Sequence, residues 1–375
     1  MSLVFADPIF LILLSLFVAF LVTYVSIPSI VEVARAKHLF DEPNGRTSHL
    51  VNTPTLGGMA IYAGFIISGM IFVNITKIGY VQYVLAGSII IFFLGLKDDI
   101  LSLSPMKKLL GQIVAAAIII DLGDVRFTNL HGFLGIHEIG YITSAFLSLF
   151  VIIVTINAFN LIDGIDGLAA GVGILAVSFF GIWFYFVGHI EIAVLAAALG
   201  GALMAFFKFN VFSKKNKIFM GDIGSLSLGF FISVMMIRFN EINIDFESPY
   251  AIHSSPVVTF GILIIPMFDT LRVFTIRIAR GQSPFSADKL HVHHRLISLG
   301  ISHRRATAIL LFINVLFIGM VLLMKDVGMY WLGLLVIGLA LVLSYLPVYL
   351  CSEKKTKGGE QRERRERSEL SGVRK

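Results

Sequence analysis

The chain has 375 residues, of which 57% are hydrophobic and only 14% are charged. Together with a mean hydropathy of +0.87, this composition excludes a soluble globular domain. The single cysteine, Cys351, excludes an internal disulfide. We therefore expect an integral membrane protein and, because segments in lipid must pair their backbone groups internally, an all-α polytopic one.

Eleven apolar runs predict membrane-spanning helices, whose usual length is about 17 to 25 residues. They cover residues 8–27, 55–74, 80–96, 109–123, 142–160, 168–187, 191–207, 223–239, 257–278, 306–324 and 330–350. The first run has no basic stretch before it and no small-residue cleavage site after it, so we interpret it as a retained anchor. Residues 1–351 are expected to form one membrane domain, and 352–375 a basic, disordered cytoplasmic tail.

The distribution of lysine and arginine indicates how the chain is oriented in the membrane. An odd number of spans places the two termini on opposite sides. With the N-terminus outside and the C-terminus in the cytoplasm, 26 of the 30 lysines and arginines lie on the cytoplasmic side. The net charge of +6 therefore reflects membrane orientation, and we expect no nucleic-acid partner.

Six aspartates lie at the cytoplasmic ends of predicted spans. They are Asp98, Asp99, Asp163, Asp166, Asp222 and Asp269. A charged side chain in hydrocarbon costs about 2.5 to 3.5 kcal/mol, so this convergence indicates a function. Adjacent carboxylates such as Asp98 and Asp99 repel each other unless a cation or shared proton is nearby, although such a pair can also simply end a helix in water. The expected cation is magnesium, with manganese as the alternative, because it takes oxygen ligands and needs few carboxylates besides substrate phosphates.

The stretch NAFNLIDGIDGLAAG repeats a polar residue at every third position. These residues are Asn157, Asn160, Asp163 and Asp166. Over three such steps an ideal helix drifts by about 180°, so the four cannot share one face. The glycine after each aspartate is expected to open the helix and bring backbone close to a ligand. The alternative is a pair of helix caps around a tight loop.

Two further motifs follow on the cytoplasmic side. FMGDIGSLSLG puts Asp222 at the start of an apolar helix, where it is either an N-cap or a ligand, and the adjacent helix amides can cradle a phosphate. ADKLHVHHRL contains a basic, titratable cluster, which we interpret as a phosphate or sugar contact, with a zinc site and a solvated loop as alternatives. The cluster comprises His291, His293, His294 and Arg295. Between the two motifs, Pro266 is expected to kink span nine, because proline removes a helix hydrogen bond.

Taken in order, four motifs resemble those of the polyprenyl-phosphate N-acetylhexosamine-1-phosphate transferases, the superfamily that includes WecA, TagO and MraY. The motifs are GLKDDILSLSPMKKLLGQ, NAFNLIDGIDGLAAG, FMGDIGSLSLG and HVHHRL. The resemblance extends over about residues 41–300 and includes the order of the spans. Because Val292 interrupts the histidine run, the pattern is more similar to the WecA and TagO branch than to the MraY branch, which tends to have three consecutive histidines.

The resemblance implies transfer of N-acetylglucosamine 1-phosphate from UDP-N-acetylglucosamine to undecaprenyl phosphate, with magnesium and release of UMP. This would be the first membrane step of a cell-envelope polysaccharide pathway. It further implies a bacterial inner (cytoplasmic) membrane protein with its site on the cytoplasmic face, and leaves a homodimer open. Residues 1–351 would then be a single catalytic domain.

The resemblance also implies roles for individual residues. The resemblance assigns magnesium binding and catalysis to Asp98, Asp99 and Asp222, and it assigns a catalytic role also to His291. Nucleotide and sugar contacts fall to Asn157, Asn160, Asp163, Asp166, His293, His294 and Arg295. Lipid-phosphate contacts fall to Lys108, which follows the aspartate pair, and to Thr53, in the tight entry to span two.

Several alternatives stay open. The donor could be the phospho-MurNAc-pentapeptide nucleotide of MraY-like enzymes or another UDP-N-acetylhexosamine. An ion-coupled transporter would also bury carboxylates, but nearer mid-bilayer and on broken helices. A CDP-alcohol phosphotransferase would need an Ala-Arg pair that DGIDGLAAG lacks. The sequence does not choose between direct displacement and a phospho-aspartate intermediate.

Overall fold

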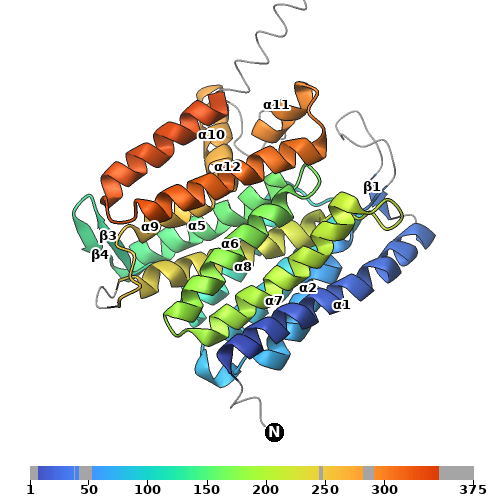
Figure 1. Ribbon diagram of the computed structural model, residues 1–375, viewed down its shortest axis with the longest axis horizontal. Helices are drawn as coiled ribbons and strands as arrows, with labels where there is room; N and C mark the ends of the chain where they lie inside the picture. Colours follow the sequence, from blue (N-terminus) through green and yellow to red (C-terminus); the bar gives the residue numbers. More distant parts are fainter. Residues whose placement is uncertain (1–6, 38, 42–52, 245–247, 282–290, 346–375) are drawn as a thin grey trace, which may run out of the picture.

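The computed structural model describes residues 7–37, 39–41, 53–244, 248–281 and 291–345 (Figure 1). Within these residues, each apolar run predicted to span the membrane overlaps one or more helices. The helices are α1 (Pro8–Ala36), α2 (Gly57–Phe72), α3 (Val81–Leu101), α4 (Pro105–Ala117), α5 (Tyr141–Ile162), α6 (Leu168–Phe186), α7 (Ile190–Phe207), α8 (Gly221–Ile242), α9 (Ser255–Ile262), α10 (Ile264–Ala279), α11 (Val292–Ser298), α12 (His303–Leu323) and a last helix, Met329–Tyr345. Shorter turns are η2 (Ile75–Lys77), η3 (Ile118–Leu122) and η4 (Lys208–Phe212). The predicted tail at 352–375 lies outside the described residues.

The lengths of these helices confirm a polytopic membrane protein. Among the described residues, six helices are long and apolar enough to cross a membrane: α1, α5, α6, α7 with η4, α8 and α12. α9 and α10 make a seventh if the bent pair counts as one span. α2 and the last helix are apolar but shorter. The largely helical fold is therefore as expected, whereas the count of eleven spans and the outside N-terminus stay predictions.

The kink expected in span nine is a break between α9 and α10, whose axes differ by 88°. α9 ends at Ile262, and Pro266 stands in the first turn of α10. Since proline has no amide hydrogen, it cannot donate to the Ile262 carbonyl four residues earlier. Asn314 of α12 donates its Nδ2 to this carbonyl at 3.0 Å. A buried side chain of another helix thus replaces the missing helix hydrogen bond.

α8 lies in the interior of the bundle, where it packs against α2, α3, α5 and α6. Glycines let two of these helices approach its first turn. A Cβ added to Gly58 would lie 2.1 Å from Gly224 N, and one added to Gly95 would lie 2.6 Å from Ile223 N. No side chain larger than hydrogen fits at these distances. The start of α8 is therefore held directly against the backbones of α2 and α3.

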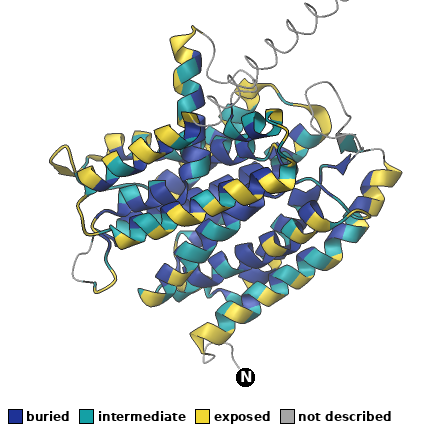
Figure 2. Ribbon diagram, turned by 45° about the horizontal axis from the view of Figure 1, so that its top comes forward, coloured by how far each residue is buried: buried dark blue, intermediate teal, exposed yellow. Residues whose placement is uncertain are grey.

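The outer faces of the bundle carry large apolar side chains, and Figure 2 shows exposed residues along the outside and buried ones within. Phe10 and Phe17 of α1 and Phe146 of α5 are each more than half exposed. A soluble protein rarely exposes so much contiguous apolar surface. This exposure is what contact with lipid requires.

Two short antiparallel ladders lie at opposite ends of the helices (Figure 1). β1 (Phe40–Asp41) pairs with β2 (Thr53–Pro54). β3 (Asn129–Phe133) pairs with β4 (Ile136–Glu138), and the two strands form a hairpin before α5. The Phe219 amide donates to the Pro54 carbonyl at 2.8 Å, so the first ladder is joined to the segment that enters α8.

Candidate active site

Asp98, Lys108 and Asp222 come together from α3, α4 and α8. The Lys108 ammonium lies 2.9 Å from Asp222 Oδ2 and forms an ion pair with Asp98 Oδ2 on its other side. The Leu103 amide donates to Asp98 Oδ1 at 2.5 Å, across the turn that joins α3 to α4. Three residues that are far apart in the sequence thus form one partly buried charged cluster.

Asp99 has different partners from its neighbour Asp98. Its Oδ1 accepts from the Asp222 amide at 2.8 Å, and its Oδ2 accepts from the Ile223 amide at 3.1 Å. These amides belong to the first turn of α8, where N–H groups have no partner within the helix. Gly221, with φ of +70°, makes room, because a Cβ there would lie 2.7 Å from an Asp99 oxygen. Asp99 therefore caps α8, and it fills the amide cradle that the sequence suggested for a phosphate.

Asn160 of α5 fixes the other side of Asp222. Its Nδ2 donates to Asp222 Oδ1 and, at 2.9 Å, to Ser225 Oγ. Ser225 in turn donates to the Gly221 carbonyl at 3.0 Å. Because Lys108 binds the second oxygen of Asp222, that carboxylate is held from two sides. Asp222 lies within the first turn of α8 and is not its N-cap.

The other polar residues of NAFNLIDGIDG have different partners, and the two aspartates lie beyond the end of α5. Asn157 Nδ2 donates at 2.8 Å to Gln112 Oε1, which joins α5 to α4. α5 ends at Ile162, so Asp163 lies on the loop that leads to α6. Burial raises the pKa of Asp163 well above its usual value, and the charges of nearby aspartates, Asp222 first among them, raise it further.

Asp166 lies on the same loop but is paired with a lysine. Lys217 Nζ lies 2.6 Å from Asp166 Oδ2. Thr307 of α12 donates its hydroxyl to the Asp166 carbonyl at 2.7 Å, which fixes the loop to the C-terminal part of the fold. Asp166 Oδ1 is buried and has no hydrogen-bond partner among the described residues. One acceptor of this carboxylate is therefore left for a ligand or a water.

The histidine cluster begins with His291, which is oriented by Asp269 of α10. His291 Nδ1 lies 3.0 Å from Asp269 Oδ2, and Arg272 donates to Asp269 Oδ1 at 2.7 Å. Since an ionised carboxylate only accepts hydrogen bonds, we place the imidazole hydrogen on Nδ1. When the ring is neutral, its lone pair lies on Nε2, a buried atom with no partner among the described residues.

His293 places the cluster against the aspartate loop. A Cβ added to Gly164 would lie 2.7 Å from His293 Nε2, so only glycine fits beside this ring. Burial, and after it the charge of neighbouring His294, lowers the pKa of His293 to about 3. His293 is therefore a neutral imidazole at pH 7. His294 and Arg295 follow on α11 and are half-buried.

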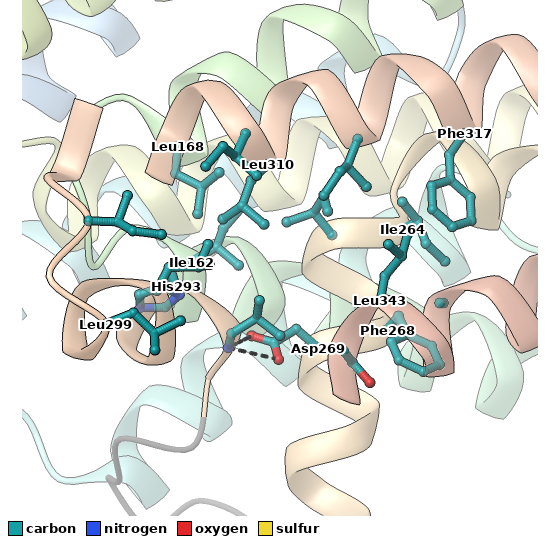
Figure 3. Close-up of a pocket in the computed structure, with 18 residues that line it drawn as sticks. Ile162, Leu168, Ile264, Phe268, Asp269, His293, Leu299, Leu310, Phe317 and Leu343 are labelled. Atoms are coloured by element: carbon teal, nitrogen blue, oxygen red, sulfur yellow. Dashed lines mark hydrogen bonds between the residues drawn. The ribbon is translucent and has the colours of Figure 1, made fainter. Parts of the chain in front are cut away.

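A cavity of 160 Å³ lies beside Asp269 and His293 (Figure 3). Figure 3 shows both residues at one end of it, with the Val292 amide bonded to the Asp269 carboxylate at 3.3 Å. Apart from Ser344, the rest of the lining is apolar, and it comes mainly from α10, α12 and the last helix. It includes Ile264, Phe268, Leu310, Phe317 and Leu343. The cavity suits an apolar group better than a sugar or a phosphate.

Whether a metal ion fits between Asp98 and Asp222 depends on Lys108, because its ammonium occupies this position. The described residues hold no group of three or more His, Cys, Asp or Glu side chains arranged to bind a metal, which also counts against a zinc site at the histidines. Between Asp98 and Asp222, however, the lysine ammonium is a stand-in cation. Magnesium commonly uses one or two carboxylates together with substrate phosphates and water. This carboxylate pair therefore fits a divalent ion if the ammonium moves aside, whereas both oxygens of Asp99 are engaged.

Three residues of the site had no role assigned from sequence: Lys217, Ser225 and Asp269. Ser225 is three residues after Asp222, so helical spacing alone would place the two on one face. The sequence indicated Asp269 only as one of six aspartates at the cytoplasmic ends of spans. Its pairing with His291 was not predictable, because the two residues are 22 positions apart. Thr53 is buried in β2, opposite Asp41.

A polytopic helical bundle that gathers carboxylates, lysines and histidines at one end defines a membrane-embedded enzyme. Residues 81–240 match Glycosyl transferase family 4. The chain belongs to the polyprenyl-phosphate N-acetylhexosamine-1-phosphate transferases, the family that its motifs indicated. This membership counts against the transporter and the CDP-alcohol phosphotransferase.

Curated relatives support the assignment over most of the chain. The probable undecaprenyl-phosphate N-acetylglucosaminyl 1-phosphate transferase of Bacillus subtilis is 30% identical over 87% of this chain and 89% of its own length. The decaprenyl-phosphate N-acetylglucosaminephosphotransferase of Mycolicibacterium smegmatis is 31% identical over 72% of this chain and 71% of its own. The undecaprenyl-phosphate alpha-N-acetylglucosaminyl 1-phosphate transferase of Escherichia coli K12 is 29% identical over 73% of each chain.

Proposed function

We propose that this protein transfers N-acetylglucosamine 1-phosphate from UDP-N-acetylglucosamine to undecaprenyl phosphate, at the cytoplasmic face of a bacterial inner membrane. The names of its relatives support these substrates. Within the molecule, the observation that carries the proposal is the meeting of Asp98, Lys108 and Asp222 from three helices. Such a cluster can bind a cation and a phosphate where two anionic substrates must approach each other.

The residues that would hold magnesium, or manganese, are Asp98 and Asp222, each of which presents one oxygen toward Lys108. When bound there, the ion would neutralise the diphosphate and the charge that develops on the leaving phosphate. Asn160 would keep Asp222 in place for this role. Asp99 would act indirectly, because it holds the first turn of α8 that carries Asp222.

In the proposed reaction an oxygen of the lipid phosphate attacks the phosphorus that carries the sugar. The new phosphorus–oxygen bond forms as the bond to the UMP oxygen breaks, and UMP leaves with the electron pair. A phosphate monoester has a second pKa of about 6, so the attacking oxygen is largely ionised at pH 7 and needs no strong base. Lys108, together with Thr53 of β2, would bind the lipid phosphate, and the lysine would reduce the repulsion between the two anions.

The alternative route passes through a phospho-aspartate. Both oxygens of Asp99 accept amide hydrogens of α8, whereas Asp98 Oδ2 faces only the Lys108 ammonium, which can move aside, so Asp98 would be the nucleophile. This route predicts that the enzyme with UDP-N-acetylglucosamine alone releases one equivalent of UMP. The direct route predicts none until lipid phosphate is added.

We assign the nucleotide and sugar to the aspartate loop and the histidine cluster. Asp166 has a free acceptor oxygen, and His291 has a free Nε2 acceptor, both without partners among the described residues. Hydroxyl and amide hydrogens of a nucleotide sugar suit such acceptors. The remaining assigned contacts are Asn157, Asp163, His293, His294 and Arg295. Of these, Asn157 already donates to Gln112 of α4, so it would help to position the site and would not contact the substrate directly.

A groove is available for the lipid tail. A cavity of 620 Å³ extends from the β3–β4 hairpin along α5, α8, α9 and the last helix to Met267 and Leu271 of α10. Its lining is almost entirely apolar, and burial of a methylene group is worth about 0.8 kcal/mol. An isoprenoid chain suits this surface.

The test is a reconstituted reaction with the purified full-length protein. UMP release should require magnesium, UDP-N-acetylglucosamine and undecaprenyl phosphate together. A panel of UDP-sugars that includes UDP-MurNAc-pentapeptide would fix the specificity. Activity with UDP-MurNAc-pentapeptide and with no other UDP-sugar of the panel would reassign the protein to an MraY-like role. The absence of UMP release with every sugar would refute the proposal.

A further inference from the structure

The place between Asp98 and Asp222 is built for a cation. Asp98 Oδ1 accepts from the Leu103 amide and Asp222 Oδ1 accepts from Asn160, so neutral donors hold one oxygen of each carboxylate. The other oxygen of each faces Lys108 Nζ. Two pinned carboxylates therefore turn their free oxygens toward a single position, which a side chain of the protein occupies.

We propose that Lys108 is a displaceable internal cation, which fills this position in the metal-free protein and leaves it when a divalent ion binds to Asp98 and Asp222. The inference rests on the proposed metal role of these two carboxylates. An ammonium and a divalent ion cannot share one pair of oxygens, because like charges at such short distances repel strongly. Lysine can move aside, because its charge sits on a flexible four-carbon stem.

The exchange would couple the metal to the lipid phosphate. In the metal-free protein Lys108 is neutralised by two carboxylates and has little attraction left for a phosphate. When the ion takes over both carboxylates, the ammonium is released at the same place, and a phosphate is its natural new partner. The protein would thus bind lipid phosphate more strongly after the metal has entered.

The first test measures binding of Mn²⁺ alone to the full-length protein in detergent, by calorimetry. Lys108→Met removes the internal competitor, so Mn²⁺ should bind about tenfold tighter or more. Lys107→Met is the matched control, because this substitution removes the same charge from an exposed residue on the same turn of α4. Its Mn²⁺ affinity should stay within about twofold of the wild type.

The second test distinguishes exchange from simple repulsion, and its main comparison uses the wild-type protein alone. The wild-type protein is acylated with an amine reagent, and the rates at Lys107 and Lys108 are compared by mass spectrometry. Saturating Mn²⁺ should raise the rate at Lys108 about threefold or more and leave that at Lys107 unchanged. In Asp222→Asn the rate at Lys108 should be high without metal and insensitive to it.

The outcomes separate the two proposals. If Mn²⁺ binds while Lys108 acylation stays constant, the exchange is wrong and the metal site stands. If neither the wild type nor Lys108→Met binds Mn²⁺, the metal role of Asp98 and Asp222 is wrong, and the exchange with it. If only Lys108→Met binds Mn²⁺, Lys108 occupies the position but is not displaced by the ion, so the exchange is wrong while the metal-binding capacity of Asp98 and Asp222 stands.

Discussion

Asp222 receives hydrogen bonds from Lys108 and Asn160, on helices other than its own, and its neighbour Asp99 receives two from the start of α8. The two carboxylates are therefore expected to differ when each is replaced by asparagine. Asp222→Asn keeps the shape of the side chain but removes the charge that a metal needs. Turnover should fall by about a thousandfold or more, with a smaller loss of thermal stability than in Asp99→Asn, because the Asp222 side chain is 24% exposed and water can solvate the new amide.

Asp99→Asn should instead lose stability and activity together. The side-chain NH2 introduced at position 99 would face a backbone N–H at the start of α8. Neither group can accept a hydrogen bond, so that backbone donor is left unsatisfied at a cost of about 1 to 3 kcal/mol. The measurements are UMP release and the melting temperature in detergent. Equal melting temperatures for the two variants would contradict the capping role of Asp99.

His293 makes a prediction about pH. Because burial lowers its pKa to about 3, the folded protein keeps this ring neutral while the unfolded chain takes up a proton below about pH 6.5. Stability from this residue is therefore present above pH 6.5 and lost as the pH falls, by about 1.4 kcal/mol per pH unit. The melting temperature of the wild type should fall more steeply between pH 7.5 and about 5.5 than that of His293→Asn. Parallel curves would contradict a buried neutral ring.

At the scale of the helices, the start of α8 depends on the glycines that face it. Gly58→Ala would place a Cβ 2.1 Å from Gly224 N, where backbone meets backbone and no side chain can yield. Such overpacking costs about 1 to 3 kcal/mol, and a displacement of Asp222 by about 1 Å would lower turnover about a hundredfold. Gly79→Ala is the control, because a Cβ there meets nothing within 4 Å. Wild-type turnover in Gly58→Ala would show that α8 is not held by this contact.

The bend between α9 and α10 provides the next prediction. Asn314→Leu would leave the Ile262 carbonyl without a donor, at a cost of about 1 to 3 kcal/mol. Since α10 carries Asp269, which orients His291, the KM for UDP-N-acetylglucosamine should rise more than kcat falls. Phe312→Leu is the control, because this residue is exposed on the same helix. A lower melting temperature with unchanged KM would make Asn314 purely structural.

Helices were more predictable from the sequence than partners were. In lipid each span must satisfy its own backbone, so an apolar run has essentially one solution, and α6 begins at Leu168 as expected. The break in span nine was predictable from Pro266, but not the amide of Asn314 that holds it. Asp98 and Asp99 are adjacent, yet they bind different elements, because successive residues point about 100° apart on a helix. Which element lies in each direction is decided by tertiary packing.

For the whole molecule, the essential feature is that the charged residues of the candidate site collect at one end of the bundle. α11, β1 and the start of α8 lie toward that end, whereas the β3–β4 hairpin lies at the other (Figure 1). The lysine and arginine asymmetry predicts that the active-site end is cytoplasmic. A nucleotide sugar made in the cytoplasm would then reach the site directly, and the lipid would enter from the side.

This orientation can be tested with single cysteines in a Cys351→Ser background, which has no other thiol. Leu134→Cys lies on the hairpin and Lys107→Cys at the active-site end, and both positions are exposed. A membrane-impermeant maleimide should label Leu134→Cys in intact spheroplasts and Lys107→Cys only after the membrane is permeabilised. The reverse pattern would place the carboxylate cluster outside the cell, where no cytoplasmic UDP-sugar could reach it. Labelling of both cysteines in intact spheroplasts would place the two ends on the same side and contradict a membrane-spanning bundle between them.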